Sequence, residues 1–68
     1  MIRYRLRQLR LQKEFSQEYI AAKLNISQKA YSKIELGRTE LTVSRLHEIA
    51  IILDFSISEY LSLEFPKK

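Results

Sequence analysis

The sequence predicts an all-α fold of five short helices in a single domain that spans residues 1–68. Apolar residues recur at intervals of three and four along most of the chain, which is the spacing of one helix face. Ser or Thr precedes most of these segments, and Asn, Asp or the single glycine follows them, as expected for helix starts and stops. Because the chain has 68 residues and no cysteine, apolar packing alone has to hold this fold together.

The first two helices are expected over residues 2–13 and 17–24. Ser16 can cap the second one, because its hydroxyl oxygen can accept a free amide of the first turn. Asn25 should end it, since asparagine tolerates the left-handed backbone conformation that terminates helices. The residues that share a face are Ile2, Leu6, Leu9 and Lys13 in the first helix and Ile20, Ala21 and Leu24 in the second.

The third helix is expected over residues 28–35, with Ser27 as its N-cap. Its apolar stripe is formed by Ala30, Tyr31 and Ile34. Gly37 lies just beyond the predicted end. A position that requires a positive φ explains why a chain so poor in glycine has one there.

The last two helices are expected over residues 43–53 and 57–62. Thr42 is the predicted N-cap of the fourth helix, and Asp54 ends it. Ser56 and Glu59 form the pattern of a capping box, which explains residues 55–58 better than a strand does. The apolar sides are Leu46, Ile49, Ala50 and Leu53 in the fourth helix, and Tyr60 and Leu61 in the fifth.

Charge is unevenly distributed along the chain, although the net charge is only +4. Residues 1–13 contain basic side chains and no acidic ones, whereas residues 41–65 are predominantly acidic. A basic first half suggests a face turned toward a polyanion such as DNA. Ordinary solvated faces remain the alternative interpretation of the same pattern.

The second and third helices have the spacing of a helix-turn-helix. They are joined by the tetrad Leu24-Asn25-Ile26-Ser27, in which the apolar Ile26 can fill the corner between the helices. The small Ala21 stands where a second helix crossing at a steep angle needs close approach. In such a unit the second helix lies in the DNA major groove.

The exposed face of the third helix carries groups that can hydrogen-bond to bases. The four side chains that cluster opposite the apolar stripe are Gln28, Lys29, Ser32 and Lys33. Glutamine can bond the N7 and N6 of adenine, lysine can donate to guanine, and serine can serve either base. The alternative is an ordinary solvated face, but this face follows the tetrad and begins at a helix N-terminus.

Residues 16–28 (SQEYIAAKLNISQ), residues 32–38 (SKIELGR) and the apolar pattern of residues 46–61 together resemble a known family. The chain resembles the lambda-repressor-like, Cro/C1-type (Xre family) helix-turn-helix domain over about residues 2–61. The resemblance implies a five-helix DNA-binding domain of a transcriptional regulator, most simply a repressor. It implies a double-stranded DNA operator as the partner.

The resemblance also implies roles for individual residues. Gln28, Lys29, Ser32 and Lys33 fall where the family contacts bases, and Ser16, Gln17, Arg38 and Thr39 fall where it contacts phosphates. Arg10 and Glu35 match a pair that ties the first helix to the end of the third. The chain departs from the family pattern at Asn25 and Asp54, which replace glycines, at Leu41, which replaces a proline, and at the acidic Glu40.

Other functions find little support in the sequence. With no cysteine and only His47 as a histidine, we expect no enzyme activity, no cofactor and no metal site, and we expect His47 to serve packing or contact solvent. Charged residues interrupt the start of the chain and the longest apolar run is residues 49–53, so we expect a cytoplasmic protein without a membrane segment.

The chain has more apolar residues than the helical stripes place in a small core, and many of them lie in the acidic C-terminal half. Tyr4, Leu11 and Ile51 fall at positions where the helical stripes predict exposure, and Phe55, Ile57, Tyr60, Leu61, Leu63 and Phe65 add to the surplus. This favours a homodimer through a C-terminal apolar surface, with a self-buried core as the alternative. The same surface favours a rival function, an antitoxin or adaptor module that docks a toxin or another protein and binds DNA only secondarily.

Overall fold

The computed structural model describes residues 3–64, with side chains described up to residue 62. The described chain forms α-helices and no strands. The helices are α1 (Tyr4–Gln12), α2 (Gln17–Leu24), α3 (Gln28–Glu35), α4 (Val43–Leu53) and α5 (Ile57–Glu64). The fold is therefore all-α, as the sequence predicts.

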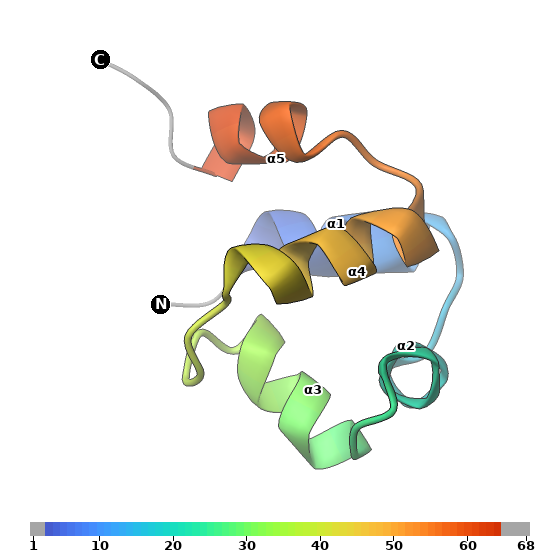
Figure 1. Ribbon diagram of the computed structural model, residues 1–68. Helices are drawn as coiled ribbons and strands as arrows, with labels where there is room; N and C mark the ends of the chain where they lie inside the picture. Colours follow the sequence, from blue (N-terminus) through green and yellow to red (C-terminus); the bar gives the residue numbers. More distant parts are fainter. Residues whose placement is uncertain (1–2, 65–68) are drawn as a thin grey trace.

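The five helices are arranged so that α2 and α3 form one end of the molecule and α5 the other (Figure 1). Helices α1 and α4 lie between these ends. In the same view α2 is seen along its axis while α3 lies across the picture, so the two helices cross steeply. The main contacts join α2 to α3 and α4, α1 to α3 and α5, and α4 to α5.

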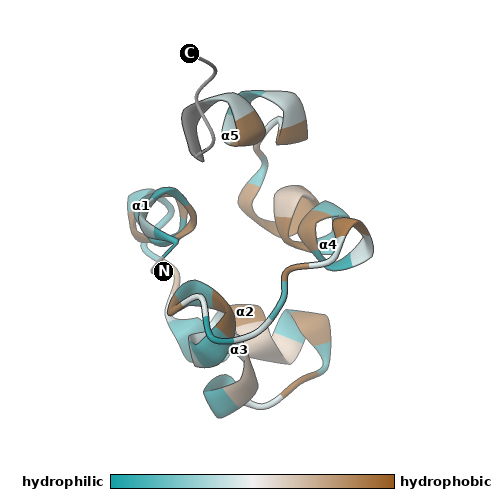
Figure 2. Cartoon of the chain, turned by 90° about the vertical axis from the view of Figure 1, so that its left-hand side faces the viewer, coloured by the Kyte–Doolittle hydropathy of each residue, from teal (hydrophilic) through white to brown (hydrophobic). Residues whose placement is uncertain are grey.

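One hydrophobic core receives side chains from all five helices. Figure 2 shows hydrophobic segments of α1, α4 and α5 turned toward one another. Because every helix buries part of its apolar face in the same cluster, the position of each helix depends on the others. The buried members of this cluster are Leu6, Ile20, Ala21, Leu24, Tyr31, Ile34, Leu46, Ile49, Leu53 and Tyr60.

Side-chain oxygens cap the first turns of four helices, as the sequence predicts. In each case the hydroxyl oxygen accepts a hydrogen bond from the backbone amide three residues further on. The donor–acceptor distances are 3.0 Å from Tyr19 to Ser16, 3.0 Å from Ala30 to Ser27, 3.1 Å from Arg45 to Thr42 and 3.3 Å from Glu59 to Ser56.

Four helices end in the same way, on a residue with a left-handed backbone conformation. These residues are Glu14 (φ 59°), Asn25 (φ 60°), Gly37 (φ 73°) and Asp54 (φ 55°). The amide of the following residue then bonds back to a carbonyl in the last turn, from Phe15 to Arg10, Ile26 to Ala21, Arg38 to Lys33 and Phe55 to Ala50. This is the hydrogen bond of a Schellman motif. The sequence predicts the helix ends at Asn25, Gly37 and Asp54, and the structure has them there. It does not predict the one at Glu14.

The predicted ranges 17–24, 28–35 and 43–53 coincide with α2, α3 and α4. The range 57–62 is too short, since α5 continues to Glu64. The range 2–13 is wrong at both ends. Arg3 is the N-cap residue, with a non-helical ψ of 75° and its amide bonded to the Glu35 carbonyl at 2.8 Å, and at the other end the left-handed Glu14 follows the helix.

The predicted face of the first helix also needs correction. Leu6 and Arg10 are its buried residues, whereas Lys13 is exposed. The true face therefore includes a charged residue, which a search for apolar periodicity does not select. Ile2, which was assigned to this face, lies outside the described residues.

Replacing Glu14 with glycine should stabilise the protein. An L-residue in the left-handed region costs about 1–2 kcal/mol, and glycine removes this cost. Part of the gain is lost again, because glycine has greater conformational freedom in the unfolded chain. We expect E14G to raise the free energy of unfolding by about 0.5–1 kcal/mol in urea titrations. Lys13 has a negative φ of −85°, so K13G relieves no strain and should lower the free energy of unfolding. If both variants were destabilised alike, the left-handed strain at Glu14 would not be real.

Candidate nucleic-acid interface

The turn between α2 and α3 is compact and anchored in the core. Asn25 is left-handed, which lets the Ile26 amide bond to the Ala21 carbonyl at 2.9 Å. Ala21 is only 2% exposed, and Ile26 packs partly buried against the core. A small residue at the crossing and an apolar residue in the corner are what a helix-turn-helix requires, and the structure forms one here.

The face of α3 opposite its buried stripe is open to solvent. Gln28, Lys29 and Lys33 are exposed and Ser32 is half-buried, while Tyr31 and Ile34 point into the core. An open depression beside α3 is lined by all four of these polar residues, together with Gln17, Leu36 and Arg38. The structure thus brings six of the eight residues predicted to contact DNA to one surface.

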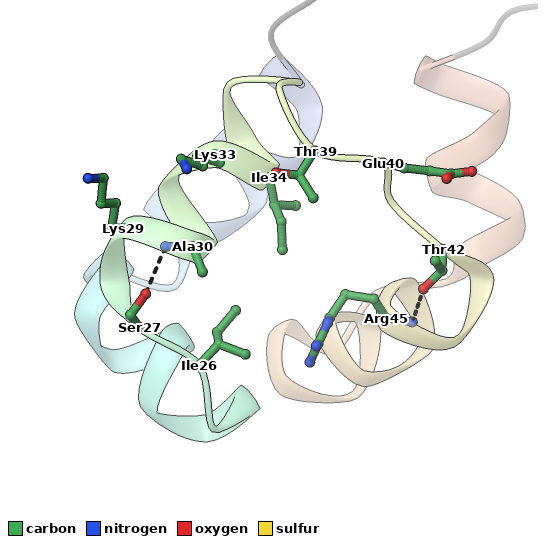
Figure 3. A pocket seen from close by; sticks show the side chains of 10 residues that line it. All are labelled: Ile26, Ser27, Lys29, Ala30, Lys33, Ile34, Thr39, Glu40, Thr42 and Arg45. Atoms are coloured by element: carbon green, nitrogen blue, oxygen red, sulfur yellow. Dashed lines mark hydrogen bonds between the residues drawn. The ribbon is translucent and has the colours of Figure 1, made fainter.

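A second groove runs along the other flank of α3, toward the start of α4 (Figure 3). Its residues are Ile26, Ser27, Lys29, Ala30, Lys33, Ile34, Thr39, Glu40, Thr42 and Arg45. Lys29 and Lys33 line both depressions, so α3 forms a ridge with a hollow on each side. A protruding helix with recessed flanks has the shape needed to enter a groove between two phosphate backbones.

The loop after α3 places its polar side chains on both flanks of the helix. Arg38 lines the hollow shared with Gln17, whereas Thr39 lines the groove on the opposite flank. Glu40 is exposed, and its side chain extends away from Lys29 and Lys33 (Figure 3). Glu40 lines the same groove as the two lysines, but it forms no ion pair with either of them.

Ser16 and Gln17 have structural roles in addition to the predicted contacts. The Ser16 hydroxyl oxygen caps α2, and its own O–H remains available as a donor. The side-chain amide of Gln17 donates to Glu35 at 3.1 Å. An amide nitrogen carries two hydrogens, so one N–H of Gln17 is left to face the hollow beside α3.

A buried ion pair joins α1 to the end of α3. Arg10 Nε lies 2.6 Å from Glu35 Oε2, and Arg10 Nη2 lies 3.2 Å from Oε1. Arg10 is 7% exposed and Glu35 is 2% exposed. The remaining guanidinium nitrogen, Nη1, donates to the Phe15 carbonyl at 2.8 Å. These residues are the pair that the resemblance to the family implies. Two parallel hydrogen bonds fix both the position and the orientation of the two side chains.

The protonation of this cluster follows from its contacts. Burial by itself would raise the pKa of Glu35, but the donors around the carboxylate, first Arg10 and then Tyr31 and Gln17, outweigh it and lower the pKa. The hydrogen bond to Glu35 raises the pKa of Arg10. Burial and the neighbouring carboxylate raise the pKa of Tyr31, whose hydroxyl lies beside the pair without a hydrogen bond of regular geometry. The pair is therefore ionised at neutral pH.

Two arginines contact the ends of the helix-turn-helix in a way that sequence reasoning missed. The Arg3 guanidinium donates to the Ile34 carbonyl in the last turn of α3. Arg45 reaches toward the Leu24 carbonyl at the end of α2, at the longer distance of 3.5 Å, and pairs with Glu48. No local sequence signal identifies such contacts, since the partners are 31 and 21 residues apart.

The surplus apolar residues do not gather on one surface. Tyr4 and Leu11 are exposed on α1, and Leu11 lines a shallow hollow with Arg5, Gln8 and Gln12. Ile51, which is 78% exposed, belongs to what we call the α4–α5 corner. This corner is a groove lined by His47, Ala50, Ile51, Asp54, Phe55 and Ile57. Leu63 and Phe65 lie outside the residues whose side chains are described.

Within the described part of the chain, no group of three or more metal-ligating side chains comes together. No helix among these residues is long and apolar enough to cross a membrane.

Comparison with known families agrees with the geometry. A family model described as helix-turn-helix matches residues 6–60, which is most of the chain. The chain therefore belongs to the Cro/C1-type helix-turn-helix family and is a DNA-binding regulator of that type. No curated protein and no solved structure matches it.

Breaking the buried pair should be costly, and the two partners should be coupled. Removing one partner leaves the other charge buried, which we expect to cost on the order of 3 kcal/mol for R10M or E35L. The double variant should lose less than the sum of the two single losses, because neither charge remains stranded. Chemical denaturation of all four proteins measures this cycle. Strictly additive losses would mean that the pair is not coupled.

The same pair should make the free energy of unfolding decrease at acid pH. Because the folded-state pKa of Glu35 lies below its unfolded value of about 4.3, its contribution is full above that value and is lost as pH falls through the folded pKa. In E35Q this part of the acid dependence should disappear. E18Q, at an exposed position of α2, should keep the wild-type profile. Denaturation from pH 6 down to about pH 2 distinguishes them, and parallel profiles for wild type and E35Q would contradict the assignment.

Proposed function

We propose that the protein is a sequence-specific transcriptional repressor that reads the major groove of double-stranded operator DNA with α3. The observation that carries this proposal is the α3 ridge, whose solvent face presents an amide, a hydroxyl and two ammonium groups without an acid. Direct readout requires such donors and acceptors on a helix that can enter the groove. The cytoplasm is the expected site of action.

The residues around the ridge divide into two proposed roles. Gln28, Lys29, Ser32 and Lys33 select bases. Ser16, Gln17, Arg38 and Thr39 hold phosphates on the two flanks, together with the backbone amides at the starts of α2 and α3. Support comes from their shared surface, since Gln17 and Arg38 line the same hollow as the four base-selecting residues, and Thr39 lines the other flank.

The α4–α5 corner is the proposed contact between two copies of the chain. The exposed Ile51 lines a groove together with the apolar Ala50, Phe55 and Ile57, which gives this corner an apolar surface that a second copy can cover. A homodimer places two α3 helices on a two-fold operator. The same corner also favours the second candidate function, in which a toxin or another protein docks there. Salt-dependent retention on DNA distinguishes the two, because only the repressor needs strong DNA binding.

Lys33 and Arg38 should affect DNA binding in different ways. After a preferred site has been selected from random DNA, K33A should reduce discrimination between that site and random DNA by about 1–3 kcal/mol. R38A should weaken binding to both DNAs similarly and flatten the dependence on salt, because it removes a phosphate contact. Titrations at several salt concentrations measure both effects. Equal losses on both DNAs for K33A would overturn the base-reading role.

Ile51 should be needed for self-association. We expect the wild-type protein to sediment as a dimer at tens of micromolar, and I51E to sediment as a monomer, because the added charge cannot be buried in the contact. L11E provides a matched control, since Leu11 is exposed on α1 outside the α4–α5 corner. A wild-type monomer, or a dimer unaffected by I51E, would exclude this corner as the dimer contact.

A further inference from the structure

The last turn of α3 is closed by bonds from two sources. From the chain that follows the helix, the Gly37 amide donates to the Ile34 carbonyl at 3.1 Å and the Arg38 amide donates to the Lys33 carbonyl at 2.9 Å. From the start of the chain, Arg3 supplies two further donors. Its backbone amide bonds to the Glu35 carbonyl at 2.8 Å, and its guanidinium bonds to the Ile34 carbonyl. The terminal carbonyls of a helix need partners of this kind.

The position of Arg3 suits this role electrostatically. The C-terminal end of a helix carries a partial negative charge, which a nearby cation stabilises. Arg3 is only half-buried, but it precedes α1 directly and is not helical itself. Arg10, which lies in α1 seven residues further along the chain, pairs with Glu35 at the end of α3. The segment around α1 therefore holds the end of α3 at two points, one on the backbone and one on a side chain.

These contacts lie directly behind the groups proposed to meet DNA. Ser32 and Lys33 stand in the last turn of α3, and Arg38 follows three residues after Glu35, the second of the two residues whose carbonyls bond to Arg3. Base readout depends on placing side chains within hydrogen-bond geometry, so a last turn that frays loses discrimination before it loses general attraction to DNA. Attraction to phosphates tolerates such movement better, because it depends mainly on net charge.

We infer that Arg3 is a positioning residue for base recognition, which acts by holding the last turn of α3 and makes no contact with DNA. The inference rests on the proposed function, because it assumes that α3 reads bases. Arg3 then has a structural role, although its charge taken from composition alone would be counted among those that bind phosphates. By this account the segment that precedes α1 is part of the DNA-reading unit.

The test compares R3A with R3K and with R7A. Arg7 is exposed on α1, so R7A removes the same charge nearby without removing a bond to α3. We expect R3A to weaken binding to the selected DNA site by about three- to tenfold while binding to random DNA changes less than twofold. The salt slope should stay at the wild-type value. R3K should recover much of the discrimination, because an ammonium can also donate to the Ile34 carbonyl.

Amide hydrogen exchange of the free protein provides a local readout. In R3A the amides of Gly37 and Arg38 should exchange faster than in the wild type, whereas the Ile26 amide at the end of α2 should not. The comparison of three amides separates a local loosening of α3 from a general loss of stability, which would accelerate all of them.

Three results would overturn the inference. A salt slope reduced by about one in R3A, with equal losses on both DNAs, would make Arg3 a phosphate contact. Faster amide exchange in R3A with unchanged discrimination between the two DNAs would mean that Arg3 contributes only to stability. Unchanged exchange and unchanged binding would show that the bond to Ile34 has no effect. K33A measured in the same assay keeps the proposed function separate, since base reading by α3 can hold while the role of Arg3 fails.

Discussion

The bidentate pair between Arg10 and Glu35 is the constraint on which the rest of the structure depends. A buried charge without its partner is costly, so the pair forces α1 and the end of α3 to stay together. Gln17 joins the same carboxylate from the start of α2, and Arg10 also bonds to the Phe15 carbonyl between α1 and α2. One carboxylate thereby fixes three helices relative to one another. These bonds fix the end of α3 against α1 and α2, and so they set the position of its exposed ridge.

Local chemistry explains how much of this fold was predictable. The bounds of α2, α3 and α4 follow from hydroxyl caps at their starts and from residues that accept a left-handed conformation at their ends, and both signals lie within a few residues. The start of α1 carries no such signal, since Arg3 before it has no side-chain cap bond and its amide bonds to Glu35, far along the chain. Glu14 was missed as a stop because glutamate rarely adopts a positive φ.

The candidate site was predictable in its residues but not in its supports. Helical spacing places the polar groups of α3 on one face, and the structure gathers them beside Gln17 and Arg38. The charge pattern was less informative, because part of the basic excess near the start of the chain serves the fold. Arg10 is buried in its ion pair, so it is not a free cation for a polyanion, and the Arg3 guanidinium bonds to a carbonyl at the end of α3. Only tertiary contacts distinguish such arginines from those that face solvent.

We propose that the ridge of α3, rather than the α4–α5 corner, meets DNA. A titration of the isotope-labelled protein with its selected DNA site, followed by amide chemical shifts, tests this most directly. The account predicts large shifts at Gln28, Lys29, Ser32, Lys33 and Arg38, with smaller ones at the start of α2. Shifts confined to Ile51 and its neighbours in the α4–α5 corner, with α3 unchanged, would contradict it.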